Sequence, residues 1–415
     1  MNFVALPRLG LFAYGVLGFP LAFAALPLYV HLPAMYGALP GVSLAAVGAV
    51  LLATRAFDAV VDPLIGRYSD RLGSRRRLVV AGLPLLAAGF FLLCRPPPGA
   101  GLLWLGSGLV IACLGLTLSS INYHAWGAEI SADPHQRTRA ITLREGCLLA
   151  GVLAASLLPA WLAQGTSMAQ GIARMGLGFP LLLGVVALVT WYAAPLPALA
   201  SRVAGPVRNL LSHPPSRRLL LIVLVSGTAS AVPATLVSFY AADVLGRPDL
   251  LGAFLALYFC AAVVGLPAWL ALARRRGRVL PWLLGMGLAI VSFAWAAWLG
   301  AGDVAPFAVI CIVSGLGLGA ELAMPPALLA DQLAAHSPPL PAGAGFGWWN
   351  LVAKLNLALG AALALGLLDW AGYVPGRINV DTQRTLALIY ALLPALLKCL
   401  ALAVLVRARA ALEAP

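Results

Sequence analysis

The chain has 415 residues, of which 62% are hydrophobic and only 10% are charged. Soluble proteins carry about 25% charged residues, so this composition excludes a soluble globular enzyme and indicates a polytopic membrane protein. The formal net charge is +13, and 25 of the 27 basic residues are Arg. Such basicity is also typical of nucleic-acid-binding proteins, but these Arg side chains lie in short loops between apolar runs, which is the pattern of membrane topology.

Apolar runs of about 18 residues or more predict twelve membrane-spanning helices. The predicted spans are 10–31, 43–66, 78–94, 101–127, 141–164, 176–195, 218–242, 250–273, 279–300, 304–330, 344–371 and 384–407. An even number of spans places both termini on one side of the membrane. The loops on that side hold 19 Arg, against 5 in the alternate loops. We therefore expect a multi-pass protein of the inner (plasma) membrane with both termini in the cytoplasm.

A long polar connection near the middle of the chain divides the spans into two sets of six. We predict an N-terminal bundle over residues 1–196, a cytoplasmic linker over 197–217 and a C-terminal bundle over 218–415. A triple Arg at 75–77 follows the second span, and another at 274–276 follows the eighth, 199 residues later. This echo predicts a duplicated six-helix unit. The expected fold is an all-α membrane protein with two pseudo-symmetric six-helix bundles.

The second predicted span carries three charges, Arg55, Asp58 and Asp62. Their spacing of i, i+3 and i+7 places them on one face of a helix. Asp58 falls about 5 Å from the middle of the span and Asp62 about 11 Å from it. A charge at such depth costs at least about 2.5–3.5 kcal/mol. We interpret this face as the binding site of a coupling cation, H⁺ or Na⁺; the alternative is a static salt bridge that orients the helices.

Three more charges lie in the C-terminal spans. Lys354, in the eleventh span, is expected to approach Asp58, where it would neutralise the carboxylate when no cation is bound. Lys398 lies near the end of the twelfth predicted span, where its ammonium can reach the membrane surface. Glu321 in the tenth span is either a second titrating group or a packing residue bonded to Ser314 or to the backbone.

After the second span, Gly66-Arg67-Tyr-Ser-Asp70-Arg71-Leu-Gly73-Ser-Arg75-Arg76 resembles the loop signature of the major facilitator superfamily. The spacing predicts a tight cytoplasmic turn in which Asp70 meets a helix N-terminus or an Arg. A loop that is merely basic would account for its Arg residues, but not for the placement of the Gly and Asp. We interpret the segment as a gating and folding element made by Gly66, Asp70, Arg71, Gly73 and Arg75.

A third segment reads Asn122-Tyr123-His124-Ala-Trp126-Gly127-Ala-Glu129 and is followed by Asp133, Arg137 and Arg144. Together with Arg55-x-x-Asp58-x-x-x-Asp62-Pro63, it resembles the glycoside–pentoside–hexuronide:cation symporters. That family includes the bacterial melibiose carriers and is related to the vertebrate lysolipid carriers. The match covers spans two to five and returns at Lys354 and at 372–375.

The resemblance implies a role for several of these residues. Asp58, Asp62 and Thr117 would form the cation site, with Lys354 and Arg55 coupling it to the substrate. Arg144 would contact the substrate from the cytoplasmic side. Arg137 would join Glu129 or Asp133 in a cytoplasmic salt-bridge set.

This chain departs from the melibiose carriers at three positions. It has an apolar stretch near Pro20-Leu21, and Ser120 in the fourth span, where those carriers hold a galactoside with Asp. It has Val61 where sodium-using members have Asn, and the loss of that oxygen favours a proton.

Other side chains of these spans are candidates for substrate binding. They are Ser120, His124, Trp126, Trp349 and Asn350. The aromatic rings could stack on a sugar ring or an apolar tail, and His124 could relay a proton. The alternative for each is an ordinary packing role.

These features predict a secondary active transporter that moves a small organic solute, such as a sugar or glycoside, by cation-coupled symport. The alternatives are a proton-driven exporter, a lysolipid or amphiphile carrier and a membrane-embedded binding or assembly protein. The sequence has no Walker loop, metal-ligand cluster or nucleophile elbow, so we do not expect an enzyme. We expect no cofactor or metal besides the coupling ion, and no nucleic-acid partner. The expected partners are the solute and membrane lipid, and the expected state is a monomer.

Overall fold

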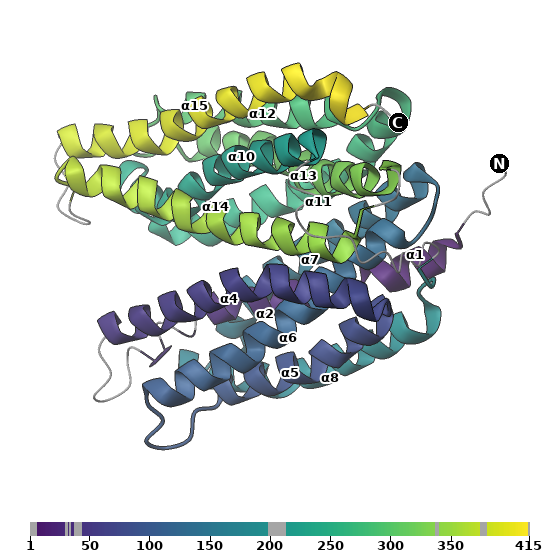
Figure 1. Ribbon diagram of the computed structural model, residues 1–415. Helices are drawn as coiled ribbons and strands as arrows, with labels where there is room; N and C mark the ends of the chain where they lie inside the picture. Colours follow the sequence, from purple (N-terminus) through teal and green to yellow (C-terminus); the bar gives the residue numbers. More distant parts are fainter. Residues whose placement is uncertain are drawn as a thin grey trace. The chain divides into compact units, whose positions relative to one another are not determined.

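A computed structural model of the protein describes residues 6–29, 32, 35–36, 44–197, 213–336, 340–373 and 380–413. Within these ranges all regular structure is helical (Figure 1). Each of the twelve predicted spans overlaps a helix, so the predicted all-α membrane fold is confirmed. The predicted linker 197–217 lies largely outside the described residues.

The chain divides into two compact units, each of which is described here by itself. The first unit comprises residues 1–207 and 336–351, and the second comprises 208–335 and 352–415. The first contains α1 (Arg8–Gly15), α2 (Gly18–Tyr29), α4 (Leu44–Leu72), α5 (Arg75–Cys94), α6 (Leu102–Glu129), α7 (Pro134–Leu162) and α8 (Met168–Ala193). The second contains α10 (Pro214–Phe239), η1 (Tyr240–Val244), η2 (Pro248–Leu250), α11 (Leu251–Arg276), α12 (Val279–Ala296), α13 (Val304–Ala335) and α15 (Val380–Glu413). Helix α14 (Ala342–Trp370) contributes its first ten residues to the first unit and the rest to the second.

Eleven helical stretches in the described part of the chain are long and apolar enough to cross a membrane. Helix α4 is not among them, although it has 29 residues, and it is the helix that carries Arg55, Asp58 and Asp62. The charges that mark α4 as functional therefore also weaken its signal as a membrane span.

The signature segment after the second span is not the turn that its sequence predicts. Helix α4 continues through Gly66 and Asp70 to Leu72, and only Gly73 and Ser74 separate it from α5. Gly73 has a φ of 62° and its N–H donates to the carbonyl of Ser69, so it ends the helix in the left-handed conformation that glycine adopts without strain. The expected turn is thus confined to two residues, and Asp70 projects from a rigid helix.

In the first unit, α5 and α6 are held together by glycine at several points of close approach. A Cβ atom at Gly115 would collide with the backbone nitrogen of Leu86 and lie 2.7 Å from the carbonyl oxygen of Gly82. A Cβ atom at Gly89 would lie 2.7 Å from the Cα of Ala112. Small residues allow the close helix approach that drives association within a membrane.

The second unit contains an ion pair that corresponds to one in the first unit. In the first unit Arg75, at the start of α5, pairs with Glu129 at the end of α6. In the second unit Arg278, which precedes α12, pairs with Asp331 near the end of α13. The structural counterpart of Arg75 is therefore Arg278, and not one of the Arg residues at 274–276 that the sequence echo indicates.

The contact between α5 and α6 predicts the effect of filling it. Gly115→Ala should lower the free energy of unfolding by about 1–3 kcal/mol, because the new methyl group must push two backbones apart. Gly184→Ala is the matched control, because a Cβ atom at Gly184 on α8 would meet nothing within 4 Å. The thermal denaturation midpoints of the purified variants in detergent measure both changes. Equal midpoints for the two variants would contradict this packing.

Candidate functional site

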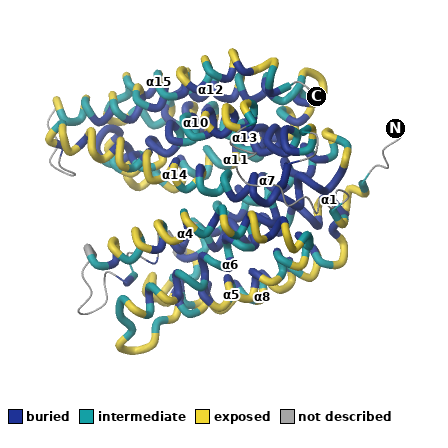
Figure 2. Tube along the Cα trace, viewed as in Figure 1, coloured by how far each residue is buried: buried dark blue, intermediate teal, exposed yellow. Residues whose placement is uncertain are grey.

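The acidic residues of α4 lie on its buried side. The side chains of Asp58 and Asp62 are 1% and 0% exposed, and Thr54, one turn earlier, is also buried. The other side of the helix is apolar and exposed, and the alternation along α4 follows the helical spacing (Figure 2). Its exposed large hydrophobic residues are Leu52, Phe57, Val60, Leu64, Tyr68 and Leu72. The structure thus brings both carboxylates into the interior, while Arg55 lies half-buried at the edge of the stripe.

Neighbouring helices pack against the buried side of α4, and Pro63 leaves a backbone carbonyl of α4 without its helical hydrogen bond. Helix α6, which carries the buried Thr117, packs against α4. Pro63 lies inside α4 and has no N–H, so the carbonyl of Ala59 lacks its helical donor. On the other side, the first residues of α14 approach α4 so closely that a Cβ atom at Gly347 would lie 2.9 Å from the carbonyl oxygen of Asp62. The two buried acids therefore lie on a helix that is packed closely by α6 and by the start of α14.

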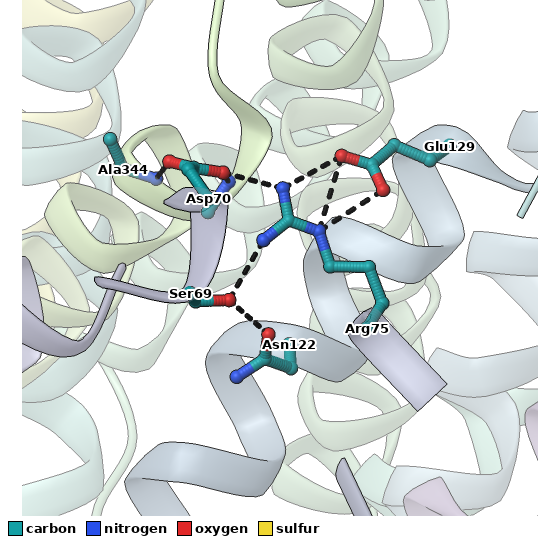
Figure 3. Close-up of polar contacts among 7 residues, drawn as sticks. Ser69, Asp70, Arg75, Asn122, Glu129 and Ala344 are labelled. Carbon is teal, nitrogen blue, oxygen red and sulfur yellow. Dashed lines mark hydrogen bonds and ion pairs between the residues drawn. The ribbon is translucent and has the colours of Figure 1, made fainter. Parts of the chain in front are cut away.

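Beyond the end of α4, Arg75 forms the centre of a buried charge cluster (Figure 3). Its side chain is 2% exposed, and its Nη2 atom lies 2.5 Å from Asp70 Oδ1 and 2.8 Å from Glu129 Oε1. Its Nη1 atom donates to Ser69 Oγ over 2.8 Å, and Ser69 donates to Asn122. The guanidinium therefore satisfies side chains from α4 and α6 at once.

Asp70 makes both contacts that its sequence context predicts. Besides the ion pair with Arg75, its carboxylate accepts hydrogen bonds from the backbone N–H groups of Gly343 and Ala344, over 2.8 and 2.7 Å. These groups open α14, where the helix N-terminus carries partial positive charge. One Arg faces two carboxylates here, and the helix N-terminus supplies the rest of the compensation. The cluster ties α4, α5, α6 and the start of α14 together.

The other predicted gating residues lie around this cluster. Gly66 is needed because a Cβ atom there would collide with the carbonyl of Gly343. Arg71 is exposed in the last turn of α4. Arg137 donates to the carbonyl of Ser131, and its predicted pairing with Glu129 or Asp133 stays a prediction. Ser69 and Asn122 were missed by sequence reasoning, although both lie within the segments that carried the signal.

Arg144 lies in a second polar cluster, inside the first unit. It is 0% exposed and bonds Glu145 through Nε at 3.1 Å and Nη2 at 2.5 Å. Its Nη1 atom is buried and makes no hydrogen bond. Gly127 faces this atom, since a Cβ atom built on it would lie 3.7 Å from Nη1. A buried donor without an acceptor is costly, so Nη1 is the kind of group that a bound oxygen would satisfy.

Two tyrosines support Arg144 from neighbouring helices. Tyr14 donates to the carbonyl of Tyr123 over 3.0 Å, and Tyr123 donates back to the carbonyl of Tyr14 over 2.5 Å. The guanidinium carbon of Arg144 lies 5.8 Å from the Tyr123 ring centroid. These reciprocal hydrogen bonds join α1 to α6 and hold the Tyr123 ring in place beside Arg144.

The remaining predicted substrate residues fall into two groups. His124 donates from Nδ1 to the carbonyl of Ser120 over 2.7 Å, and its ring stacks on Phe346 with centroids 5.5 Å apart. Trp349 and Asn350 are half-buried just beyond Phe346 on α14. Trp126, in contrast, is fully buried, and its Nε1 donates to the carbonyl of Pro195. Its geometry is that of a packing residue, and its substrate contact stays a prediction.

One of the two lysines, Lys398, differs from its expected role. Lys398 does not reach the membrane surface: it is 1% exposed and pairs with Glu321, at 2.6 Å from Oε2. Glu321 bonds Ser226 and Lys398, while Ser314 donates to the carbonyl of Ile310 instead. The prediction is wrong because Lys398 lies near the middle both of the predicted span 384–407 and of α15, so its ammonium is far from either end of the helix. Lys354 belongs to the second unit and Asp58 to the first, so their predicted approach stays a prediction.

Comparison with known proteins identifies the architecture. The sequence model of a family described as MFS/sugar transport protein matches residues 9–410. The inner membrane symporter YicJ of Escherichia coli (strain K12) is 24% identical over 377 residues, which cover 85% of this chain and 80% of YicJ.

Two solved structures share the fold at low sequence identity. A bacterial homologue of the iron transporter ferroportin, in an outward-facing state, has a TM-score of 0.70 and 18% identity, and the match covers 97% of this chain and 99% of that one. The human organic anion transporter MFSD10 (TETRAN) has a TM-score of 0.68 and 16% identity, over 94% of this chain and 98% of that one. The sequence resemblance to facilitator-type symporters and the expected fold class are thereby confirmed.

The cluster around Arg75 predicts a large loss of stability when its centre is removed. Arg75→Met should lower the free energy of unfolding by about 3–5 kcal/mol, because it leaves two buried carboxylates without their cation. Arg77→Met is the matched control, since Arg77 is exposed two residues away on the same helix. Thermal denaturation in detergent measures both. Similar midpoints for the two variants would mean that the cluster contributes no more than an exposed charge.

Proposed function

Because the chain belongs to the MFS/sugar transport protein family of the major facilitator superfamily, we propose that it is a secondary active transporter that couples the entry of H⁺ or Na⁺ to uptake of a small organic solute, such as a sugar or glycoside. Family and fold are those of multi-pass membrane transporters and not of enzymes. The observation that carries the proposal is the pair of buried carboxylates, Asp58 and Asp62, one turn apart on α4.

These carboxylates suit a cation for electrostatic reasons. Like charges at i and i+4 repel each other, and burial strengthens that repulsion. A cation or proton at the site relieves it, and the oxygen of Thr117 on the adjacent α6 adds a ligand. In this mechanism the repulsion between the two carboxylates is unfavourable when no external cation is bound. A cationic side chain of the protein then offsets it, and Lys354 is the candidate. Cation binding then releases the lysine and favours the conformation that accepts solute.

Arg144 is the candidate solute contact. Its buried Nη1 has no acceptor, and a sugar hydroxyl or a carboxylate would supply one. His124, Ser120, Trp349 and Asn350 would complete the solute site. The charge cluster at Arg75 would act as the cytoplasmic gate, because Asp70 holds the start of α14 through two backbone hydrogen bonds that opening on that side would break.

The distribution of Arg supports an inner-membrane protein with both termini in the cytoplasm. We propose that the protein works as a monomer and needs no cofactor besides the coupling ion.

Neutralising one acid tests the coupling. Asp58→Asn should reduce uptake driven by a cation gradient at least about tenfold. The variant should still insert into the membrane and unfold at a temperature similar to that of wild type. Asp381→Asn is the control, because Asp381 is an exposed aspartate at the start of α15. Uptake of radiolabelled sugars and glycosides into proteoliposomes is the measurement. Full concentrative uptake by Asp58→Asn would remove the cation role from this residue.

The identity of the coupling ion has its own test. Because Val61 supplies no oxygen between the two acids, we expect uptake to follow an imposed pH gradient and to proceed without Na⁺. Proteoliposomes are given either a pH gradient or a Na⁺ gradient at fixed pH, and initial rates are compared. Strict dependence on Na⁺ would overturn the preference for a proton. Absence of solute-dependent ion flux with sugars, glycosides and lysolipids alike would favour a binding or assembly role.

A further inference from the structure

The second unit contains a buried ion pair that the proposed symport site does not use. Lys398 on α15 directs its Nζ atom at Glu321 on α13, at 2.8 Å from Oε1 and 2.6 Å from Oε2. Ser230 Oγ on α10 lies 3.0 Å from the same ammonium, and Ser226 donates to Glu321 Oε2 over 2.9 Å. All four residues belong to the second unit, so the cluster is complete within it.

This pair lies at the depth where charge is most costly. Glu321 lies about 2 Å along the axis from the midpoint of the 32-residue α13, and Lys398 lies about 2 Å from the midpoint of the 34-residue α15. Ionisable residues at the centre of membrane helices are rare and generally functional. A pair that served only packing could be replaced there by apolar residues without loss of stability.

Helix α13 has a proline and two glycines close to Glu321. Pro325 lies four residues further along α13 and has no N–H, so the carbonyl of Glu321 lacks its helical donor. Gly317 and Gly319 hold α13 against its neighbours, because Cβ atoms there would lie 2.6 Å from the Gly285 carbonyl and 2.7 Å from the Ala262 carbonyl. The closely packed α13 therefore presents the Glu321 carboxylate to α10 and α15.

The two partners differ in their access to solvent. The side chain of Lys398 is 1% exposed, whereas that of Glu321 is 10% exposed. The ionisable groups that interact with Glu321 are Lys398 and, from α11, Tyr258. Helix α10 contributes only the two serine hydroxyls, and α12 has no ionisable side chain between Val279 and Ala296. The carboxylate is thus the reachable member of the pair, and its one strong counter-charge is an ammonium on a flexible stem.

We propose that Glu321 is a second proton-binding site, located in the C-terminal unit and separate from the acids of α4, with Lys398 as the internal cation that replaces the proton. In the paired state the carboxylate is charged and Lys398 neutralises it. A proton from water then binds Glu321 to give the neutral acid, and Lys398 keeps its ammonium charge and its contact with Ser230. The charge of the site changes from zero to +1. A proton is favoured over Na⁺ because it adds no second ion beside the ammonium.

Carbodiimide labelling tests the site without knowledge of the transported solute. Dicyclohexylcarbodiimide reacts with protonated carboxylic acids in apolar surroundings, and mass spectrometry of peptides locates the adduct. In the folded wild-type protein, labelling of Glu321 should rise at least about tenfold as the pH falls from about 8.5 to about 5.5. In Lys398→Met the same rise should occur about 1–3 pH units higher, because an adjacent cation favours the charged carboxylate by that amount.

Asp331 is the internal control, because it lies on the same helix and pairs with Arg278 near the far end of α13. Its labelling should be the same in wild type and Lys398→Met. A Glu321 that stays unlabelled over the whole pH range, or whose labelling ignores both pH and Lys398→Met, is a static ion pair and would overturn the proposal.

A second measurement covers variants that fold poorly. Glu321→Gln/Lys398→Met removes both charges and so leaves no unpaired ion. It should take up fewer protons per molecule than wild type over the pH range in which Glu321 becomes labelled, as read by an indicator dye. An unchanged proton count would also overturn the proposal.

The same labelling in Asp58→Asn/Asp62→Asn separates this site from the proposed symport site. If Glu321 keeps its pH dependence there, the two sites are independent, and failure of solute uptake would concern only the acids of α4. Loss of the Glu321 response in that variant would refute a separate site.

Discussion

A charged side chain at membrane depth must meet an opposite charge, a helix end or an ion, because the apolar surroundings provide no water to solvate it. The interior of this protein is organised by that requirement. Arg75 meets two carboxylates, Asp70 also meets the N-terminus of α14, and Lys398 meets Glu321. The contacts of Asp70 with α14 and of Lys398 with Glu321 join helices that are far apart in the sequence. Charge compensation therefore specifies which helices are neighbours, a task that lipid-like apolar surfaces cannot perform.

Apolar packing supplies the close approach between those helices. Glycines at the contacts of α5 with α6 and of α13 with α11 and α12 let backbones approach where any Cβ atom would collide. Dispersion contacts and not burial from water hold helices together in a membrane, so close approach is the main source of packing energy there. The same rigidity positions Asp70 and Glu321 on helices instead of loops, so that their charges are held at fixed distances from their partners.

The two units share one ion-pair arrangement but differ in their chemistry. Both use an Arg before one helix and an acid at the end of the next, Arg75 with Glu129 and Arg278 with Asp331. Among the described residues, the first unit has buried acids on its second span and the second unit has a buried lysine–glutamate pair. The two units therefore share a helical scaffold but differ in the charges that they bury.

The sequence by itself determined the helical class, the positions of the spans, the buried face of Asp58 and Asp62, and the kinds of group that Asp70 contacts. Each of these depends on local features: apolar length, the helical period and the spacing of Gly and Asp. Only the tertiary structure decided that Glu321 pairs with Lys398, that Ser69 and Asn122 extend the cluster at Arg75, and that Gly66 lies within a helix. Such pairings join residues up to 77 positions apart, and no local pattern encodes them, because they depend on which helix faces meet once the units have packed.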